Sequence, residues 1–207
     1  MRRVKGLVLV AGVFLLSSCV KNIDTGMVGF DLMNACIASD LARISRLVKQ
    51  GADINDTWQG VTPLMRASQD GNLAVVQHLL SLGADPKKSV SGATALNYAT
   101  SNRRHDISIL LLKRGADPNA RPQVGLYDSP LATAIMASDK LLIEALIAAG
   151  ATTNDPTALQ AALLGCSRSN WDNSYARFLL EKSPELKQGT GLGGTLAATS
   201  LKLCPSF

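Results

Sequence analysis

A Gly-Ala-Asp triplet recurs along the chain at a constant interval. It begins at Gly51, Gly83 and Gly115, so 32 residues separate each copy from the next, and a related Gly-Ala-Thr triplet begins at Gly150. A period of this size indicates a stacked array in which each unit is one supersecondary motif. Because one such unit cannot cover its own apolar face, the period predicts an elongated stack in which neighbours share a core.

A second marker keeps the same register. The triplets Thr-Pro-Leu at 62–64, Thr-Ala-Leu at 94–96 and Ser-Pro-Leu at 129–131 each begin 21 residues before a glycine of the first marker. Thr62 suits a helix N-cap, and Pro63 suits the first helical position, where a backbone N–H has no partner to lose. An inner helix is therefore expected to begin at each of these triplets.

Each unit predicts a pair of helices. In the unit that begins near Gly60, the inner helix carries Leu64, Ala67 and Ser68 on one face, and these side chains are small enough for close helix packing. The outer helix has an apolar stripe at spacings of three and four, and Gly83 supplies the left-handed conformation that ends it. The stripe consists of Val75, Val76, Leu79 and Leu80.

The unit from Gly60 to Asp85 closely resembles the ankyrin repeat, and four registers of the chain agree with it. The resemblance implies an all-α solenoid of stacked helix-turn-helix units with short β-hairpin fingers. It also implies a function in protein recognition. We expect units at about 31–55, 56–88, 89–120, 121–154 and 155–188, with a C-terminal cap at 189–207. The first unit lacks a preceding finger, as an N-terminal cap should.

Two departures from the family pattern are visible. The histidine usual at the fourth position of the Thr-Pro-Leu motif is replaced by Met65, Asn97 and Ala132, which is expected to remove a hydrogen bond between repeats. The finger at 118–128 is also three residues longer than the two before it, because Gly115 to Ser129 spans 14 residues where the preceding intervals span 11. Loops are where solenoids vary when they bind a partner.

The family pattern also indicates which residues reach a partner. Trp58, Val90 and the pair Leu126–Tyr127 are expected to form an apolar row on adjacent fingertips, which is typical of an interface hot spot. The alternative is that Trp58 and Leu126 fold back over the finger bases. The full candidate set is Trp58, Gln59, Val61, Gln69, Asp70, Val90, Ser91, Ser101, Asn102, Arg121, Val124, Leu126, Tyr127 and Met136.

The N-terminus resembles a bacterial lipoprotein signal. A short basic segment precedes the apolar run 6–16, and Leu16-Ser17-Ser18-Cys19 then matches a lipobox. The resemblance implies a signal peptide at 1–18, diacylglycerol on Cys19, and a tether at 19–30. Val20 rather than Asp after the cysteine favours the periplasmic face of the outer membrane. The alternatives are an ordinary secretory signal or a membrane helix, but the apolar run is shorter than the roughly 20 residues that span a bilayer.

Charge argues against a nucleic-acid partner. The chain holds 21 Lys and Arg against 16 Asp and Glu, and loss of Arg2, Arg3 and Lys5 with the signal leaves 18 against 16. No run of three basic residues occurs after the signal, whereas a nucleic-acid site needs a basic stripe.

Neither catalysis nor a bound cofactor or metal is expected. His78 falls in an outer helix and His105 in a turn, and neither has a Ser, Cys or carboxylate at a recognisable catalytic spacing. Residues 189–194 spell Gly-x-Gly-x-x-Gly, but they follow a helical end rather than a strand, so they are interpreted as a flexible connection. No Cys and His spacing suggests a metal site.

The remaining cysteines have structural interpretations. Cys166 and Cys204 fall near the ends of neighbouring inner helices and are plausible disulfide partners, which would suit an oxidising compartment. The alternative is two buried thiols, because equivalent positions in adjacent repeats are often too far apart to bond. Cys36 occupies a small core-facing position and is expected to be a buried thiol.

These expectations combine into one functional hypothesis. The chain is expected to be a monomeric protein-binding module on a lipid tether. The favoured role is an inhibitor or immunity protein that occludes a toxic effector enzyme acting in the periplasm, such as a secreted lipase or phospholipase. One alternative is a scaffold that organises a resident cell-envelope complex. A second is a lipid- or peptidoglycan-handling protein, which should enclose an apolar pocket.

Overall fold

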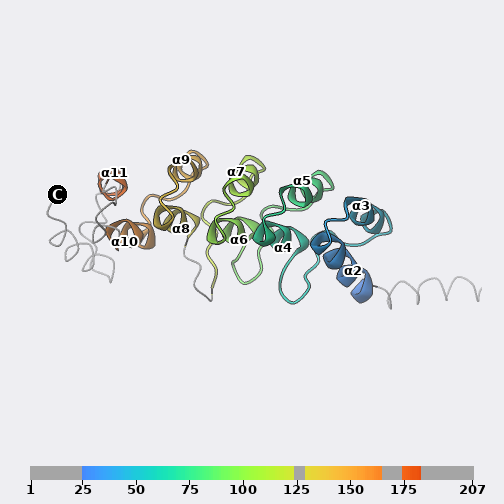
Figure 1. Ribbon diagram of the computed structural model, residues 1–207. Helices are drawn as coiled ribbons and strands as arrows, with labels where there is room; N and C mark the ends of the chain where they lie inside the picture. The colour runs from blue at the N-terminus through green and yellow to red at the C-terminus, as the bar shows by residue number, and fades with distance from the viewer. Residues whose placement is uncertain (1–24, 124–128, 165–173, 183–207) are drawn as a thin grey trace, which may run out of the picture.

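The computed structural model describes residues 25–123, 129–164 and 174–182. Within them, helices follow one another in five pairs that lie side by side in a row, with the first helix of each pair in an inner layer and the second in an outer layer (Figure 1). The inner layer consists of α2 (Thr25–Ile37), α4 (Pro63–Asp70), α6 (Ala95–Ser101), α8 (Pro130–Met136) and α10 (Pro156–Leu164). The outer layer consists of α3 (Leu41–Lys49), α5 (Leu73–Ser81), α7 (His105–Lys113), α9 (Lys140–Ala148) and α11 (Ser174–Lys182). The expected all-α stack of helix pairs is confirmed.

The inner helices begin where the second sequence marker predicts. The Thr62 hydroxyl accepts a hydrogen bond from the Met65 N–H at 3.2 Å, with Pro63 at the first helical position. The Ser129 hydroxyl caps α8 in the same way, at 3.2 Å from the N–H of Ala132. These bonds satisfy N–H groups that have no partner inside the helix.

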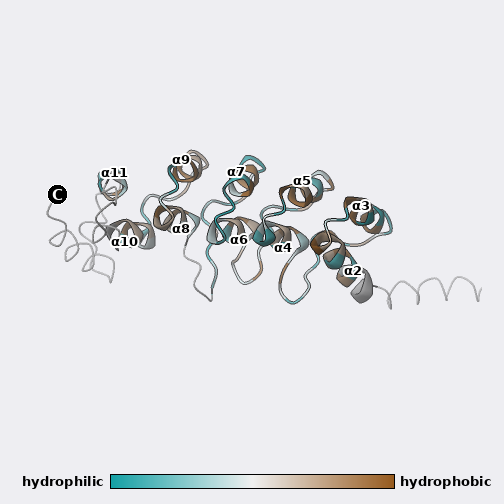
Figure 2. Ribbon diagram, in the orientation of Figure 1, coloured by the Kyte–Doolittle hydropathy of each residue, from teal (hydrophilic) through white to brown (hydrophobic). Residues whose placement is uncertain are grey.

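Equivalent residues of successive repeats form the core. The inner helices pack in series from α2 to α10, because each presents a buried leucine followed three residues later by a buried alanine. Figure 2 shows hydrophobic stretches in the helices of both layers. Among the helices of the described segments, none is both long enough and apolar enough to cross a membrane. The buried leucine and alanine of the successive inner helices are Leu32 with Ala35, Leu64 with Ala67, Leu96 with Ala99, Leu131 with Ala134, and Leu159 with Ala162.

The aspartate of the repeated triplet shapes the loop that leaves each outer helix. In three repeats its carboxylate accepts a hydrogen bond from the backbone N–H two residues on, at 2.8–2.9 Å. In two of these loops that later residue is an asparagine, whose side chain accepts a bond from the next repeat. Asn55 accepts from the N–H of Asp85 at 2.8 Å, and Asn119 accepts from that of Thr152 at 2.7 Å.

One expectation from the sequence is wrong, and a second is wrong for one of the three repeats that it covered. Helix α2 begins at Thr25, so the tether predicted to reach residue 30 ends earlier, and residues 25–30 extend the first inner helix. The hydrogen bond expected to be lost with the motif histidine is present in one repeat, where the Asn97 amide donates to the carbonyl of Ala120 at 3.0 Å. The Asn97 amide supplies an N–H donor, as an imidazole can.

The two described fingers are tight two-residue turns. Gln59 and Gly60 have φ of 52° and 77°, and Ser91 and Gly92 have φ of 50° and 79°. Positive φ at both positions is the type I′ geometry of a hairpin. Each finger closes with one antiparallel bridge, Trp58 to Val61 or Val90 to Ala93, and the described residues contain no longer strand.

We expect alanine substitutions at the two finger glycines to lower the unfolding free energy by different amounts. An alanine at Gly60 meets nothing within 4 Å, so Gly60→Ala is expected to lose only the left-handed backbone preference, about 1 kcal/mol of unfolding free energy. A Cβ at Gly92 would lie 2.1 Å from the carbonyl oxygen of Arg121, so Gly92→Ala should cost clearly more. Urea unfolding of both variants measures the difference. Equal losses would contradict the close approach of residues 121–123 to this finger.

Candidate protein-binding surface

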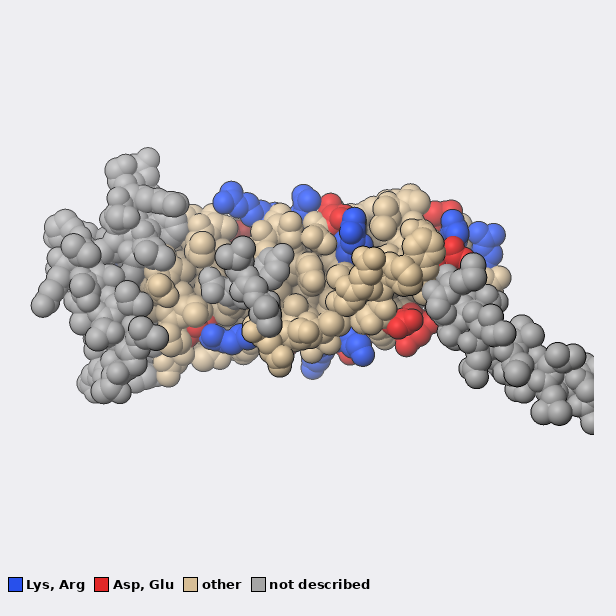
Figure 3. All heavy atoms as spheres, turned by 90° about the horizontal axis from the view of Figure 1, so that it is seen from below, with Lys and Arg blue, Asp and Glu red and all other residues tan. Residues whose placement is uncertain are grey.

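The finger turns extend beyond the inner layer and, with the ends of the inner helices, define the candidate surface (Figure 1). In the view of Figure 3, charged side chains gather mainly along the two long edges, and much of the strip between them is uncharged. The predicted residues that are exposed are Trp58, Gln59, Asp70, Ser91, Arg121 and Met136. Val61, Gln69, Val90, Ser101 and Asn102 are half-buried. Val124, Leu126 and Tyr127 lie outside the described residues, as do Cys19, Cys166 and Cys204.

The Trp58 ring packs against a second aromatic side chain. Its ring centroid lies 4.9 Å from that of Phe30 in α2, with a tilt of 52° between the ring planes. Trp58 is 39% exposed and Phe30 is 43% exposed. The result is an exposed aromatic pair at the N-terminal end of the stack. The sequence missed Phe30 because it assigned residue 30 to the tether.

Val90, which was predicted in the apolar row on the fingertips, is only partly exposed. Val61 and Val90 are half-buried and pack against the hydrophobic core, and each belongs to the antiparallel bridge that flanks its turn. The exposed turn positions carry Gln59 and Ser91 instead. The exposed turn positions of both described fingers are therefore polar.

The inner-helix ends combine satisfied polar groups with one exposed apolar side chain. The Asp70 carboxylate lies 2.8 Å from Arg66 Nε, and the Asn102 amide donates to the Tyr98 carbonyl at 2.8 Å. Met136 is 54% exposed at the end of α8. The polar groups are held by intramolecular bonds, so a partner would meet an ordered surface.

Arg121 is part of a buried network as well as of the long finger. Its guanidinium lies 2.7 Å from the Asp155 carboxylate, which is 2% exposed. Asp155 also accepts bonds from the Ser129 hydroxyl, and from the Thr157 N–H and hydroxyl at 3.0 and 2.8 Å. Burial alone would raise the pKa of Asp155, but the bonds from Ser129, Thr157 and Arg121 lower it below the usual value. The network joins the start of the long finger to the starts of α8 and α10.

We expect removal of the Asp155 charge to lower the unfolding free energy by an amount that depends on pH. The pKa in the folded state lies below the ordinary value of 3.8, so the carboxylate stabilises the fold above that pH. This contribution disappears as the pH falls through the folded-state pKa. We expect Asp155→Asn to lower the unfolding free energy at pH 7 by about 2 kcal/mol, and the gap from the native chain to narrow below about pH 4.

Urea unfolding at several pH values measures this gap. Asp106→Asn is the control, because Asp106 is an exposed carboxylate in the first turn of α7. A gap for Asp155→Asn that stays constant down to acid pH would show that the charge does not stabilise the fold.

Both histidines have polar partners that the sequence did not reveal. His78 Nε2 lies 2.7 Å from the Ser45 hydroxyl, and His105 Nδ1 lies 2.6 Å from the Asp139 carboxylate. His105 also begins α7 rather than lying in a turn. Each pair joins one outer helix to the next, and Asp139 additionally caps α9, so these contacts serve the stacking of repeats.

Two further observations concern reactive groups. Cys36 is buried as expected, and burial raises the pKa of its thiol to about 12, which keeps the sulfur in its unreactive form. The described residues contain no group of three or more potential metal ligands.

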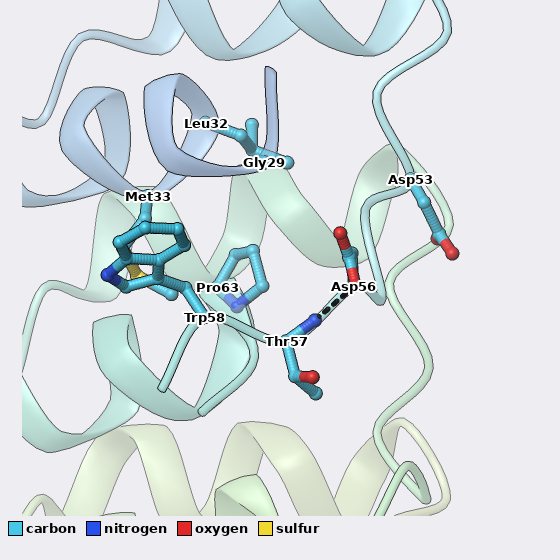
Figure 4. A pocket seen from close by; sticks show the side chains of 8 residues that line it. All are labelled: Gly29, Leu32, Met33, Asp53, Asp56, Thr57, Trp58 and Pro63. Carbon is cyan, nitrogen blue, oxygen red and sulfur yellow. Dashed lines mark hydrogen bonds between the residues drawn. The ribbon is translucent and has the colours of Figure 1, made fainter. Parts of the chain in front are cut away.

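A pocket of about 200 Å³ opens beside the aromatic pair (Figure 4). One wall comes from α2 and the other from the loop that precedes α4, with the Trp58 ring beside Met33 and the Asp56 carboxylate on the far side of Pro63. The lining residues are Gly29, Leu32, Met33, Asp53, Asp56, Thr57, Trp58 and Pro63.

Comparison with known families agrees with the geometry. Residues 32–122 match the family model of ankyrin repeats, in three copies. No curated protein matches the chain in sequence. Ankyrin repeats are typically non-catalytic interaction modules, so the match indicates that the chain acts by binding protein partners.

Proposed function

Because residues 32–122 are ankyrin repeats, we propose that the chain is a membrane-anchored inhibitor that covers the active site of a toxic enzyme. The observation that carries this proposal is the exposed surface of fingers and inner-helix ends, where an aromatic pair and Met136 stand on a rigid stack. Aromatic and sulfur-containing side chains of this kind anchor protein interfaces. The favoured target is a secreted lipase or phospholipase that acts in the periplasm.

Lipidation of Cys19 would hold the stack close to the membrane. Five residues separate Cys19 from Thr25, where α2 begins. Even fully extended, the six steps from Cys19 to Thr25 reach at most about 22 Å. A periplasmic location, on the outer membrane, places such an anchored inhibitor where an enzyme that attacks membrane lipids would work.

Occlusion requires a surface that loses little freedom on binding. Repeat-to-repeat bonds hold the loops of this stack, and polar groups at the inner-helix ends already have intramolecular partners. A pre-organised surface gives up less conformational entropy when a partner docks. The uncharged strip between the charged edges would contact the target, and the edges would steer its approach.

Two truncations test the proposed surface. We expect Trp58→Ala and Met136→Ala each to weaken partner binding by more than about 1 kcal/mol, because each removes an exposed apolar anchor. The control is Leu141→Ala, since Leu141 is 64% exposed but lies on outer helix α9. Isothermal titration with the captured partner gives the affinities. An effect of Leu141→Ala equal to the other two would move the interface to the outer layer.

Affinity capture tests the function itself. The full chain is immobilised and exposed to envelope and secreted fractions, and bound proteins are identified by mass spectrometry. The proposal predicts recovery of one secreted or periplasm-active hydrolase whose activity falls as the chain is added. Recovery of resident envelope proteins with unchanged activity would contradict inhibition and favour an envelope scaffold.

A further inference from the structure

The pocket beside Trp58 has an apolar interior and an acidic rim. Leu32, Met33 and Pro63 contribute hydrocarbon and sulfur surface, and the Trp58 indole closes one side (Figure 4). Asp53 and Asp56 lie on the opposite side, on the loop that leads into α4. Its volume of about 200 Å³ is below the roughly 300–1,000 Å³ of sites for drug-sized ligands. The pocket therefore suits a single side chain.

Among the described residues, no cation pairs with the two carboxylates at the rim. Asp53 accepts the N–H of Asn55 at 2.9 Å, and Asp56 accepts that of Thr57 at 2.7 Å. Within the described part of the chain, neither forms an ion pair, whereas Asp31 in α2 is paired with Arg43 at 3.1 Å. Each of the rim carboxylates uses one oxygen for its loop, and the second oxygen of Asp56 faces Gly29 across the pocket, 3.1 Å from where a glycine Cβ would lie.

We propose that this pocket binds a lysine or arginine side chain of the protein partner. The aliphatic stem would lie against Trp58, Met33 and Pro63, and the cationic head would meet Asp56 on the opposite side of the pocket. The opposite charges of ligand and rim select a basic residue over an apolar one of the same length. This proposal rests on the proposed function in one respect, because the basic side chain that fills the pocket belongs to the protein partner.

The backbone around the pocket is held in place before any ligand arrives. Gln59 and Gly60 form the tight turn that follows Trp58, and the Phe30 ring supports the indole from α2. Asp53 and Asp56 are bonded to their own loop. A side chain that enters would order few additional groups, which favours a specific contact.

A small probe tests the pocket without the partner. The ¹⁵N-labelled full chain is titrated with N-acetyl-arginine amide or N-acetyl-lysine amide, and the Trp58 indole N–H resonance, assigned from its absence in Trp58→Phe, reports binding. We expect saturation with a dissociation constant on the order of 1 mM, the usual strength for a ligand of this size. N-acetyl-norleucine amide, which keeps the stem but lacks the charge, should bind more weakly than either probe.

Variants distinguish a pocket from a general charge effect. Asp56→Asn is expected to weaken the basic probes about threefold to fivefold, and Asp106→Asn on α7 should leave them unchanged. Both variants are compared with the native chain by thermal unfolding to confirm that the fold is kept. No saturable shift, or equal binding of the norleucine and arginine probes, would overturn the proposal.

The probe and the capture experiment can fail separately. Probe binding without any captured partner would leave the basic-residue site standing and remove the inhibitor function. A captured hydrolase whose affinity is unchanged by Asp56→Asn, together with no probe binding, would keep the function and reject the pocket.

Discussion

Every helix pair in this chain depends on its neighbour to cover its apolar face. The inner helices meet through a buried leucine and a buried alanine that recur in each repeat, and equivalent residues of successive repeats pack against one another. In three repeats the two sequence markers are 21 residues apart, and extra length enters outside that interval, where Gly115 to Ser129 spans 14 residues.

Polar contacts between repeats also hold neighbouring repeats in one position relative to each other. Loop asparagines bind the next loop, the Asn97 amide binds the carbonyl of Ala120, and the two histidines join neighbouring outer helices. Such bonds tolerate little sliding of one repeat past the next, because a shifted donor would lose its acceptor. The resulting stiffness keeps the finger surface pre-organised for a partner.

Local signals in the sequence predicted much of the fold. Thr62 with Pro63, and Ser129 with Pro130, identified helix starts, and the spacing of Leu and Ala identified buried faces, because these features depend on residues within one turn of a helix. The start of α2 was missed, although the interval from Val28 to Leu32 continues a helical pattern upstream.

Contacts across the stack were less accessible from sequence. Arg121 reaches Asp155, and His105 reaches Asp139, in each case in the neighbouring unit, and which atoms meet depends on the path of a loop. The two partners of each histidine contact are about one repeat length apart in the sequence, and this spacing could have suggested the contacts. The pocket beside Trp58 was missed for a related reason, since its wall on α2 includes Gly29, which was assigned to the tether.

Hydrogen–deuterium exchange of the chain with and without its captured partner tests most directly whether the inner face is the recognition surface. Added protection is predicted in the fingers around Gln59 and Ser91 and at the C-terminal ends of α4 and α8, with outer helices α5, α7 and α9 unchanged. Protection confined to those outer helices would contradict the account, because it would place the partner on the opposite layer of the stack.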